Sequence, residues 1–261
     1  MGEPLLEVSD LRRSFGGLQA VSHVSFRVPR GAIKAVIGPN GAGKTTLFNL
    51  IAGTLASHGG TVRFQGRSIT ARKPHAIAAM GIARTFQTTK LFAHMTVLEN
   101  VMVGRHPRTR SGFLAGMLSL PRTWREERQT EAKARAIVED MGLGANAQET
   151  AENLPFGRQR LVELARAMAT EPALLLLDEP AAGLNIHETR ELAGLIQGIR
   201  ERGVTCLIVE HDMSLVMDIS DDVVVLDQGR KIAEGPPHAI QRNDEVIRVY
   251  LGEEYAQDPE S

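Results

Sequence analysis

The chain has 261 residues, of which 43% are hydrophobic and 4% aromatic, so it is long enough to bury the core of one large α/β domain. Its 30 Lys and Arg against 31 Asp and Glu give a formal net charge of -1, which excludes a global basic field for nucleic acid or anionic lipid. The single cysteine, Cys206, excludes a disulfide scaffold, and no apolar run reaches the roughly 18 to 20 residues of a membrane span, so we expect a protein of the cytoplasm.

Two segments near the start of the chain alternate between apolar and polar residues. In residues 21–28, VSHVSFRV, the side chains of Val24, Phe26 and Val28 share one face, which predicts a half-buried antiparallel strand. Residues 61–69, TVRFQGRSI, repeat this pattern weakly around a glycine. We therefore expect an antiparallel sheet in this part of the chain.

Three other segments are almost continuously apolar and then end in polar or turn-forming residues. They are residues 32–38, 173–180 and 204–212. That composition predicts central parallel strands covered on both faces. Helical patterns closed by a glycine occur at 44–53 and 188–203. The alternation predicts a parallel sheet wrapped by helices.

Residues 88–165 interrupt this alternation, because they contain no strand-like run and are typical of helices joined by polar turns. We interpret them as an inserted helical subdomain. Residues 1–87 and 166–251 then form the rest of a single domain that spans residues 1–261.

The end of the chain contains two further features. Residues 223–235, VVVLDQGRKIAEG, predict a β-hairpin around Gln228 and Gly229. Residues 252–261, GEEYAQDPES, predict an acidic, disordered tail.

Residues 38–46, GPNGAGKTT, follow a predicted buried strand and open a helix. They match the phosphate-loop pattern G-x-x-x-x-G-K-[ST]. Glycines let backbone N–H groups surround phosphate oxygens, the lysine reaches the β- and γ-phosphates, and the first threonine offers its hydroxyl to Mg²⁺. The predicted nucleotide-binding residues are Gly38, Pro39, Asn40, Gly41, Ala42, Gly43, Lys44, Thr45 and Thr46.

The buried strand at 173–180 ends in two neighbouring carboxylates, Asp178 and Glu179. Neighbouring side chains at a strand end point in different directions, so they can take different roles. Beside a nucleotide, Asp178 would hold Mg²⁺, directly or through water, and Glu179 would orient and deprotonate the attacking water. Asp-Glu-Pro is also an ordinary turn after a strand, but the phosphate loop upstream favours the catalytic interpretation.

His211 ends the apolar run at 204–212 and so emerges at the same carboxyl edge of the sheet, where open α/β folds bind ligands. We predict that it contacts the γ-phosphate rather than serving as a structural histidine. Gln87 lies where the core gives way to the helical insertion. We predict that its amide contacts Mg²⁺ or water and reports the nucleotide state to the insertion.

Taken in chain order, these motifs resemble those of the ATP-binding subunit of ATP-binding-cassette (ABC) transporters, over nearly the whole chain. The resemblance implies a P-loop NTPase (RecA-like) core with an antiparallel β subdomain and an inserted helical subdomain. It implies ATP and Mg²⁺ as cofactors, and a dimer in which two subunits enclose two ATP molecules. Phe15 corresponds to the aromatic residue that stacks on adenine, the alternative being an apolar strand residue. Residues 181–185, AAGLN, match the loop that crosses the dimer interface, with Asn185 where aspartate is commoner.

Residues 154–158, LPFGR, stand where the family signature loop is most often L-S-G-G-Q. In the family this loop faces the phosphates that the partner subunit binds. Gly157 remains, and its missing side chain lets backbone approach a phosphate at a helix N-terminus. Pro155 and Phe156 replace a serine and a glycine. We expect Arg158 to offset the lost hydroxyl by reaching the partner's ATP.

Residues 91–106, 207–235 and 246–254 are most similar to one ATPase subunit of high-affinity branched-chain amino-acid importers. That resemblance implies a second ATPase subunit in a homodimer or heterodimer, two permease chains and, indirectly, a substrate-binding protein. It places the chain peripherally on the cytoplasmic face of the bacterial inner membrane, with no nucleic-acid partner. The predicted function is ATP hydrolysis that drives uptake of branched-chain or other hydrophobic amino acids through a separate permease.

Two segments are candidates for contact with that permease. We expect Leu91, Phe92 and Met95 to form the docking site for a permease coupling helix. Residues 106–128 mix arginines with apolar side chains. They form either an amphipathic element packed within the insertion or a surface that meets the permease or lipid headgroups.

Two other functions share these motifs. The ATPase subunit of a lipid or lipopolysaccharide exporter is similar over the same segments, and asymmetric ABC pairs contain a regulatory subunit with a degenerate site. The presence of Lys44, Asp178, Glu179 and His211 argues against the degenerate subunit.

Overall fold

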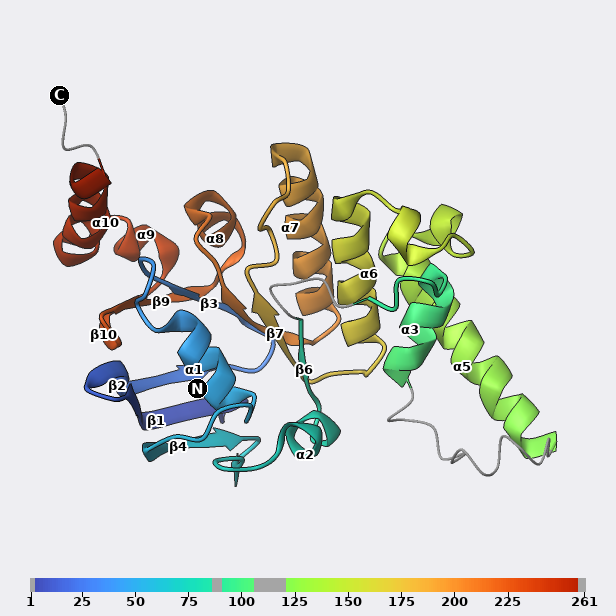
Figure 1. Ribbon diagram of the computed structural model, residues 1–261, viewed down its shortest axis with the longest axis horizontal. Helices are drawn as coiled ribbons and strands as arrows, with labels where there is room; N and C mark the ends of the chain where they lie inside the picture. Colours follow the sequence, from blue (N-terminus) through green and yellow to red (C-terminus); the bar gives the residue numbers. More distant parts are fainter. Residues whose placement is uncertain (1–2, 86–90, 106–120, 258–261) are drawn as a thin grey trace.

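The computed structural model describes the backbone of residues 3–85, 91–105 and 121–257, with side chains in these ranges except at 121–127 and 251–257. Two sheets organise the molecule (Figure 1). One is antiparallel, with the strand order β2-β1-β4-β5. The other has the order β10-β9-β3-β8-β7-β6, in which β9 to β6 pair in parallel and β10 pairs antiparallel to β9.

The described strands are β1 (Leu6–Phe15), β2 (Leu18–Val28), β3 (Ile33–Ile37), β4 (Gly59–Phe64), β5 (Arg67–Ser68), β6 (Ile82–Arg84), β7 (Leu174–Asp178), β8 (Thr205–Val209), β9 (Asp222–Asp227) and β10 (Arg230–Gly235). The described helices are α1 (Lys44–Ile51), α2 (Pro74–Ala79), α3 (Val97–Arg105), α5 (Pro121–Asp140), α6 (Phe156–Met168), α7 (Ile186–Glu201), α8 (Met213–Ile219), α9 (Pro237–Ile240) and α10 (Asp244–Gln257), with short 3-10 turns η2 (Gly144–Asn146) and η3 (Ala151–Asn153).

The alternation predicted near the start of the chain is confirmed in β2. Val24, Phe26 and Val28 are buried, while Ser25 and Arg27 face solvent. The weaker pattern forms the paired strands β4 and β5. The apolar face of this antiparallel sheet packs in one cluster with α1, the helix that follows the phosphate loop.

The three continuous apolar runs form β3, β7 and β8, and every residue of these strands is buried. They lie side by side in the middle of the six-stranded sheet (Figure 1). Both faces of the sheet are covered there, which is why these strands are apolar throughout. The cluster with α1 and the antiparallel sheet covers one face, and α6 and α7 cover the other. The carboxyl ends of β3, β7 and β8 therefore meet at one edge of the sheet, with α1 beginning there.

The predicted hairpin at 223–235 is confirmed as β9 and β10. Gln228 has a φ angle of 44° and Gly229 of 79°, and two consecutive positive φ values fit the tight turns that match the twist of a hairpin. This hairpin ends beside the phosphate loop, since the N–H of Gly229 donates to the carbonyl of Ala42.

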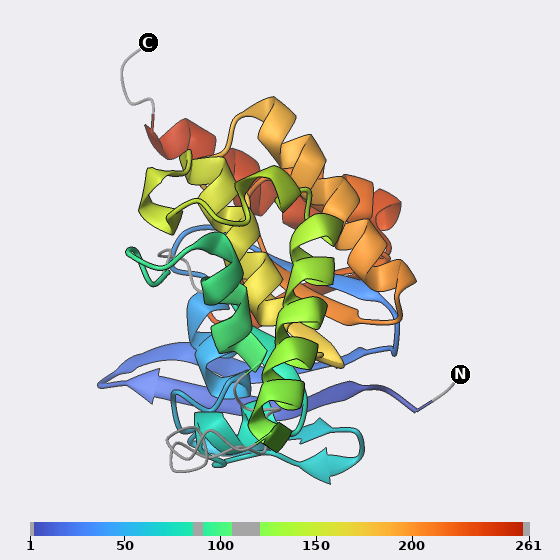
Figure 2. The ribbon, with the colours of Figure 1, turned by 90° about the vertical axis from the view of Figure 1, so that its right-hand side faces the viewer.

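The helical insertion is confirmed in the part that the structure describes. Within 91–105 and 121–165 the residues form helices and turns, and the only ladder is an isolated bridge between Thr96 and Thr150. Helix α3 packs against both α5 and α6 (Figure 2). Helix α6 continues without interruption across residue 165 to Met168, so the helix that follows the signature loop links the helical part to the core.

The segment predicted as an acidic tail follows and partly overlaps a helix. Helix α10 begins at Asp244, and its backbone continues through Gln257. Val246 of its first turn is buried and packs with the β9–β10 hairpin, so the helix starts on the core and runs on from there. No helix among the described residues is long and apolar enough to cross a membrane.

Candidate nucleotide site

The phosphate loop connects β3 to α1, and its shape depends on two glycines. Gly38 has a φ angle of 148°, and a Cβ there would overlap the carbonyl oxygen of Leu226. Gly43 has a φ angle of 99°, and a Cβ there would overlap the carbonyl oxygen of Ala20. Any larger residue would have to push away backbone at both positions, so the chain holds this loop in one conformation.

Lys44 is buried at the start of α1, and its ammonium lies inside the loop. Nζ donates to the carbonyl oxygens of Gly38 at 2.6 Å and Pro39 at 2.9 Å. These two residues form the base of the loop, while Asn40 to Thr46 line an open cleft of about 1110 Å³. A cleft of this size, with backbone N–H groups and a lysine at one end, suits a nucleotide.

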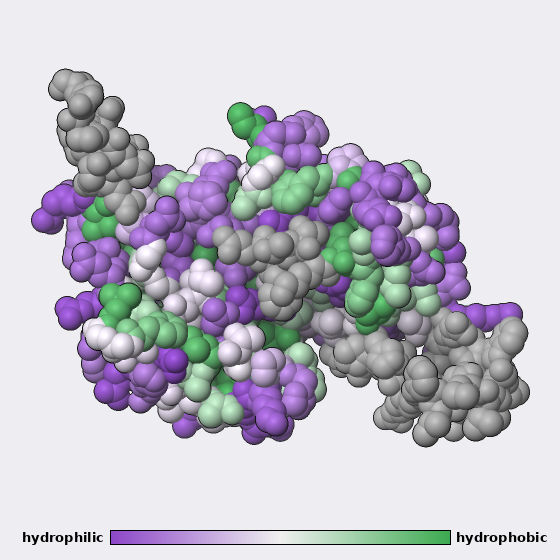
Figure 3. Space-filling model, in the orientation of Figure 1, coloured by the Kyte–Doolittle hydropathy of each residue, from purple (hydrophilic) through white to green (hydrophobic). Residues whose placement is uncertain are grey.

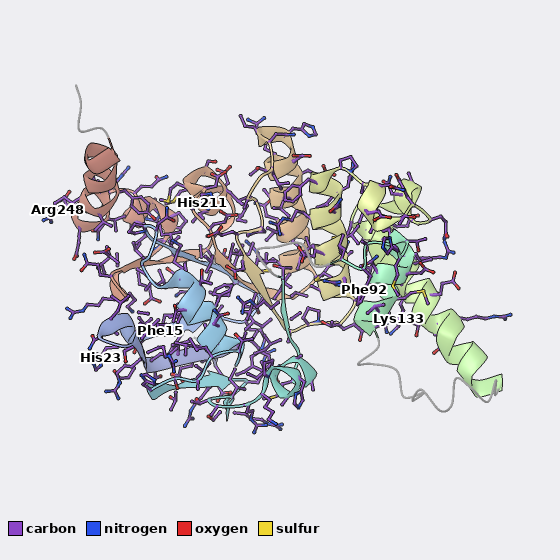
Figure 4. The ribbon with its side chains drawn as sticks, in the orientation of Figure 1. Phe15, His23, Phe92, Lys133, His211 and Arg248 are labelled. Carbon is purple, nitrogen blue, oxygen red and sulfur yellow. The ribbon has the colours of Figure 1, made fainter. Side chains whose placement is uncertain are left out.

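Phe15 and the start of β2 also line the cleft. The Phe15 side chain is 47% exposed, and the Arg13 guanidinium lies 4.8 Å from the centre of its ring. Figure 4 shows Phe15 at the end of β1, below the start of α1. A half-exposed ring on the cleft wall is available for stacking on a base, so the position of Phe15 fits the adenine role better than that of a buried strand residue.

Glu179 lines the same cleft and follows directly after β7. Its φ angle of 47° is in the left-handed region, which is unfavourable for a residue with a side chain. Its backbone N–H donates to Val209 at the end of β8, which holds this conformation. His211 Nδ1 lies 4.0 Å from Glu179 Oε2, so the structure brings together the two residues predicted from separate strands.

His211 is fixed by a carboxylate that the sequence interpretation did not include. Glu210 is completely buried, and one of its oxygens accepts from the N–H of Ala181 at 2.8 Å. The other accepts from the N–H of His211 at 2.9 Å. Glu210 thus ties the loop after β7 to the loop after β8, and the sequence signal was a carboxylate that directly follows a buried strand.

Asp178 ends β7 and is 2% exposed. Its Oδ2 accepts from Arg84 at 2.8 Å, whereas its buried Oδ1 accepts no hydrogen bond from the described residues. Thr45 lines the cleft, whereas Asp178 lies behind its wall and is not among the lining residues. A carboxylate oxygen and a hydroxyl are nevertheless the oxygen ligands that Mg²⁺ takes. The third predicted metal residue, Gln87, lies outside the described residues.

The signature loop leads into α6, and it contributes no residue to the cleft of its own chain. Pro155 is the N-cap of α6, a place that tolerates its missing N–H. A Cβ on Gly157 would overlap the Glu188 carboxylate. Phe156 is 45% exposed under the Arg160 guanidinium, which lies 5.2 Å from the centre of its ring. Figure 1 places the start of α6 and the start of α1 on opposite sides of β7 and α7.

Arg158 and Asn185 both make contacts within the chain. Arg158 Nη1 donates at 3.2 Å to the carbonyl of Gly142 and at 3.2 Å to Glu191, and the side chain remains 37% exposed. Asn185 caps α7, accepting from the N–H groups of His187 at 2.9 Å and Glu188 at 3.1 Å. An amide oxygen caps a helix as well as a carboxylate does, which explains why asparagine is tolerated here.

The predicted docking residues precede α3. Phe92 is 47% and Met95 38% exposed, while Leu91 is partly buried against the core of the helical part. The buried Asn100 side chain bonds the backbone of Phe92 and Met95 and so fixes their loop. Apolar surface gathers where Figure 4 places Phe92 (Figure 3). Residues 106–120 lie outside the described residues, and of 121–128 the structure gives the helical backbone of α5.

A sequence profile described as ABC transporter matches residues 21–182, which is more than half of the chain. The chain belongs to the ABC transporter family. This ABC subunit also matches, at residues 230–256, a profile described as branched-chain amino acid ATP-binding cassette transporter. These matches confirm the predicted family, fold class and ATPase activity.

Individual relatives agree with this assignment. The ABC subunit is 46% identical to the high-affinity branched-chain amino acid transport ATP-binding protein BraF of Pseudomonas aeruginosa, over 97% of this chain and 100% of that protein. It is 44% identical to LivG of Escherichia coli, with the same coverage. A crystal structure of an ATP-binding cassette of an ABC transporter in its ADP conformation superposes with a TM-score of 0.85 at 32% identity, over 96% of this chain and 100% of that one.

Proposed function

We propose that this ABC subunit hydrolyses MgATP to drive the uptake of branched-chain or other hydrophobic amino acids through separate permease subunits. The observation that carries the proposal is the cleft lined by the phosphate loop, the exposed ring of Phe15 and Glu179, with His211 Nδ1 4.0 Å from Glu179 Oε2. The names of the relatives and the match of residues 230–256 support the transported class.

ATP would lie along the cleft with its adenine on Phe15 and its phosphates in the loop from Asn40 to Thr46. Lys44 would exchange the carbonyl oxygens of Gly38 and Pro39 for the β- and γ-phosphates. Asp178, Thr45 and Gln87 would hold Mg²⁺. When bound, the ion neutralises charge that develops on the phosphate oxygens.

Glu179 would act as the general base on the attacking water, and His211 would contact the γ-phosphate. The carboxylate is 19% exposed, so it can reach a water in the cleft while its backbone is fixed by Val209. Glu210, which binds the N–H of His211, would keep the imidazole at the same edge. This division of roles places the base and the phosphate contact on two neighbouring strands.

The catalytic unit would be a dimer with this chain or with a second ATPase subunit. Gly157 and Arg158 do not line the chain's own cleft. In the dimer, the same loop of a second chain would face the ATP bound here. The exposed side chains of Phe156 and Ile186, 45% and 75% exposed, lie at the starts of α6 and α7 and would be covered by that partner.

The permease would contact Leu91, Phe92 and Met95. Because Asn100 fixes their loop and α3 packs on α6, a movement at this surface would be transmitted to the helix that carries Gly157. A substrate-binding protein would act on the permease from the other side. The subunit would lie at the cytoplasmic face of the bacterial inner membrane. Residues 1–87 and 166–251 would form the nucleotide-binding core with the antiparallel β subdomain, and 88–165 the helical subdomain with the signature loop.

Reconstitution with the permease subunits that copurify from the native membrane tests the function. We expect ATP-dependent uptake of labelled leucine into vesicles that contain the binding protein, and no uptake when the subunit carries Glu179→Gln. Transport that depended strictly on a lipid substrate would instead establish the exporter function. Full leucine uptake with the Glu179→Gln subunit would indicate that this chain has a regulatory role.

A further inference from the structure

Arg84 is the last residue of β6, and its guanidinium joins two elements of the nucleotide site. Nη2 donates to Asp178 Oδ2 at 2.8 Å, and Nη1 donates to Asn49 Oδ1 at 2.8 Å. The Arg84 side chain is 11% exposed, so these bonds lie mostly away from water. β6 and β7 are parallel neighbours, which brings Arg84 near the end of β7 where Asp178 lies.

Arg84 binds only one of the two oxygens of the Asp178 carboxylate. The side chain is 2% exposed, and a buried carboxylate without a partner is costly. Arg84 compensates the charge through Oδ2 and stops the group from rotating. Oδ1 accepts no hydrogen bond within the described ranges, so it is the oxygen that remains for the ion.

The second hydrogen bond of Arg84, to Asn49, connects the guanidinium to α1. Asn49 follows Thr45 by four residues, and residues four apart lie on the same face of a helix. Thr45 supplies the hydroxyl of the proposed metal site. One guanidinium therefore connects the helix that carries Thr45 with the strand that carries Asp178.

The chemistry favours arginine over lysine at this position. A guanidinium is planar, and its two Nη groups reach separate acceptors in fixed directions, whereas an ammonium is a single point of charge. Thr85, the next residue, reinforces the contact between the segments, since its N–H donates to Leu176 at 3.0 Å.

We propose that Arg84 is a positioning residue for the Mg²⁺ site, which holds Asp178 Oδ2 and Asn49 so that Asp178 Oδ1 and the Thr45 hydroxyl face the ion together. Arg84 acts through these residues and is not itself a catalytic residue. The inference rests on the proposed function, because it requires that MgATP binds in the cleft.

Calorimetric titration of the full-length chain with a non-hydrolysable ATP analogue tests the inference, once with Mg²⁺ and once with EDTA. Arg84→Gln should reduce the gain in affinity that Mg²⁺ provides by about 10- to 100-fold, the range for residues that orient metal ligands. Binding in EDTA should stay within about twofold. Arg84→Lys should give an intermediate loss, because it keeps the charge and loses the second bond.

Two further variants protect the test against a folding defect. Asn49→Ala keeps the Arg84–Asp178 pair and should reduce the Mg²⁺ gain by less than Arg84→Gln does, with an unchanged melting temperature. In a chain that already carries Asp178→Asn, Arg84→Gln should have no further effect on the Mg²⁺ gain, because its route to the ion has been removed.

Three results of the titrations would contradict the inference or the function on which it rests. Equal losses with Mg²⁺ and with EDTA in Arg84→Gln would show that Arg84 supports the fold alone and would overturn the inference. An unchanged Mg²⁺ gain would overturn it as well. If the affinity of the wild-type chain were the same with Mg²⁺ and with EDTA, the proposed MgATP site itself would be wrong. That result distinguishes failure of the proposed function from failure of the Arg84 inference.

Discussion

The phosphate loop and the signature loop each lead into a helix, α1 and α6, yet the chain constrains them to different degrees. Gly38 and Gly43 lie against backbone carbonyls of the same chain, and Lys44 is bonded within the loop. Gly157 lies against the Glu188 side chain, which accepts from the N–H of Asn185 at the start of α7, and Phe156 beside it is half exposed. The first loop is complete in one chain, whereas in the proposed dimer the second would present its surface to the partner chain.

The largest expected effect is on hydrolysis at the phosphate-loop side. Glu179→Gln should lower the turnover by about 100- to 10,000-fold, because the amide cannot take a proton from water. ATP binding should persist, and a closed dimer should accumulate in size-exclusion chromatography. The exposed Glu201→Gln on α7, which removes the same charge, should turn over normally. Unchanged turnover in Glu179→Gln would remove Glu179 from the role of base.

Alanine at the two glycines tests the comparison directly. Gly38→Ala should abolish ATP binding and lower the free energy of unfolding by about 1 to 3 kcal/mol through backbone strain alone. Gly157→Ala should leave ATP binding by the isolated subunit intact, since Gly157 does not line its cleft, but should prevent closure on the partner's nucleotide. Melting curves and ATP titrations distinguish the two. If both variants lost ATP binding alike, the proposed division between the loops would be wrong.

Phe15, the proposed contact of the adenine base, should contribute less to ATP binding than the phosphate loop does. Phe15→Ala should weaken ATP binding by about 5- to 150-fold, since loss of aromatic stacking on a base costs about 1 to 3 kcal/mol. Phe15→Tyr keeps the ring and should bind as the wild type does. Equal affinities for all three proteins would place the adenine elsewhere in the cleft.

Arg158 is the sharpest test of the signature side. Arg158→Ala should slow ATP-driven dimer closure by about 10-fold, the effect of one hydrogen bond to a charged group, with little change in ATP binding by the subunit alone. Glu191→Gln removes the negative charge beside Arg158 on α7 and serves as the matched control. It should leave closure intact or speed it. Equal slowing by both variants would show that Arg158 acts only through its bond within the chain.

The smallest effect is expected at the helix after His211. Asp212 caps α8, and hydrogen bonds from the Ser214 hydroxyl, opposed by partial burial and supported by backbone N–H groups, hold the pKa of Asp212 below its usual value. Its ionised form therefore stabilises the fold above about pH 4, and this contribution is lost as the pH falls through the lowered pKa. Asp212→Ala should cost about 1 kcal/mol at neutral pH and less at low pH.

Urea unfolding at pH 7 and pH 3 measures this difference. Asp212→Asn keeps a capping oxygen that does not titrate, so its difference from Asp212→Ala should change little between the two pH values. A cost of Asp212→Ala that grew on acidification would contradict the sign of the lowered pKa.

Several elements could be predicted from the sequence because their causes are local. The phosphate loop needs glycines and a lysine at fixed spacing, which can be recognised in the sequence. Buried parallel strands need continuous apolar runs, so β3, β7 and β8 could be predicted in the same way. Asp178, Glu179 and His211 followed because parallel strands bring their carboxyl ends to one edge. Helix α10 was missed because its acidic composition resembles that of a tail, while burial of Val246 starts it on the core.

The rest was decided by contacts between segments that are distant in the chain. The bonds of Arg84 cross 35 residues to Asn49 and 94 to Asp178, and Glu210 reaches Ala181 across 29. The partners of Arg158 lie in the turn after α5 and on α7, which are likewise distant in the chain. The sequence by itself determined which residues can bind phosphate and activate water, since these functions depend on residue type and short spacing. Only the tertiary structure determined which charges hold them in place, because that depends on which strand ends and helix faces the fold brings together.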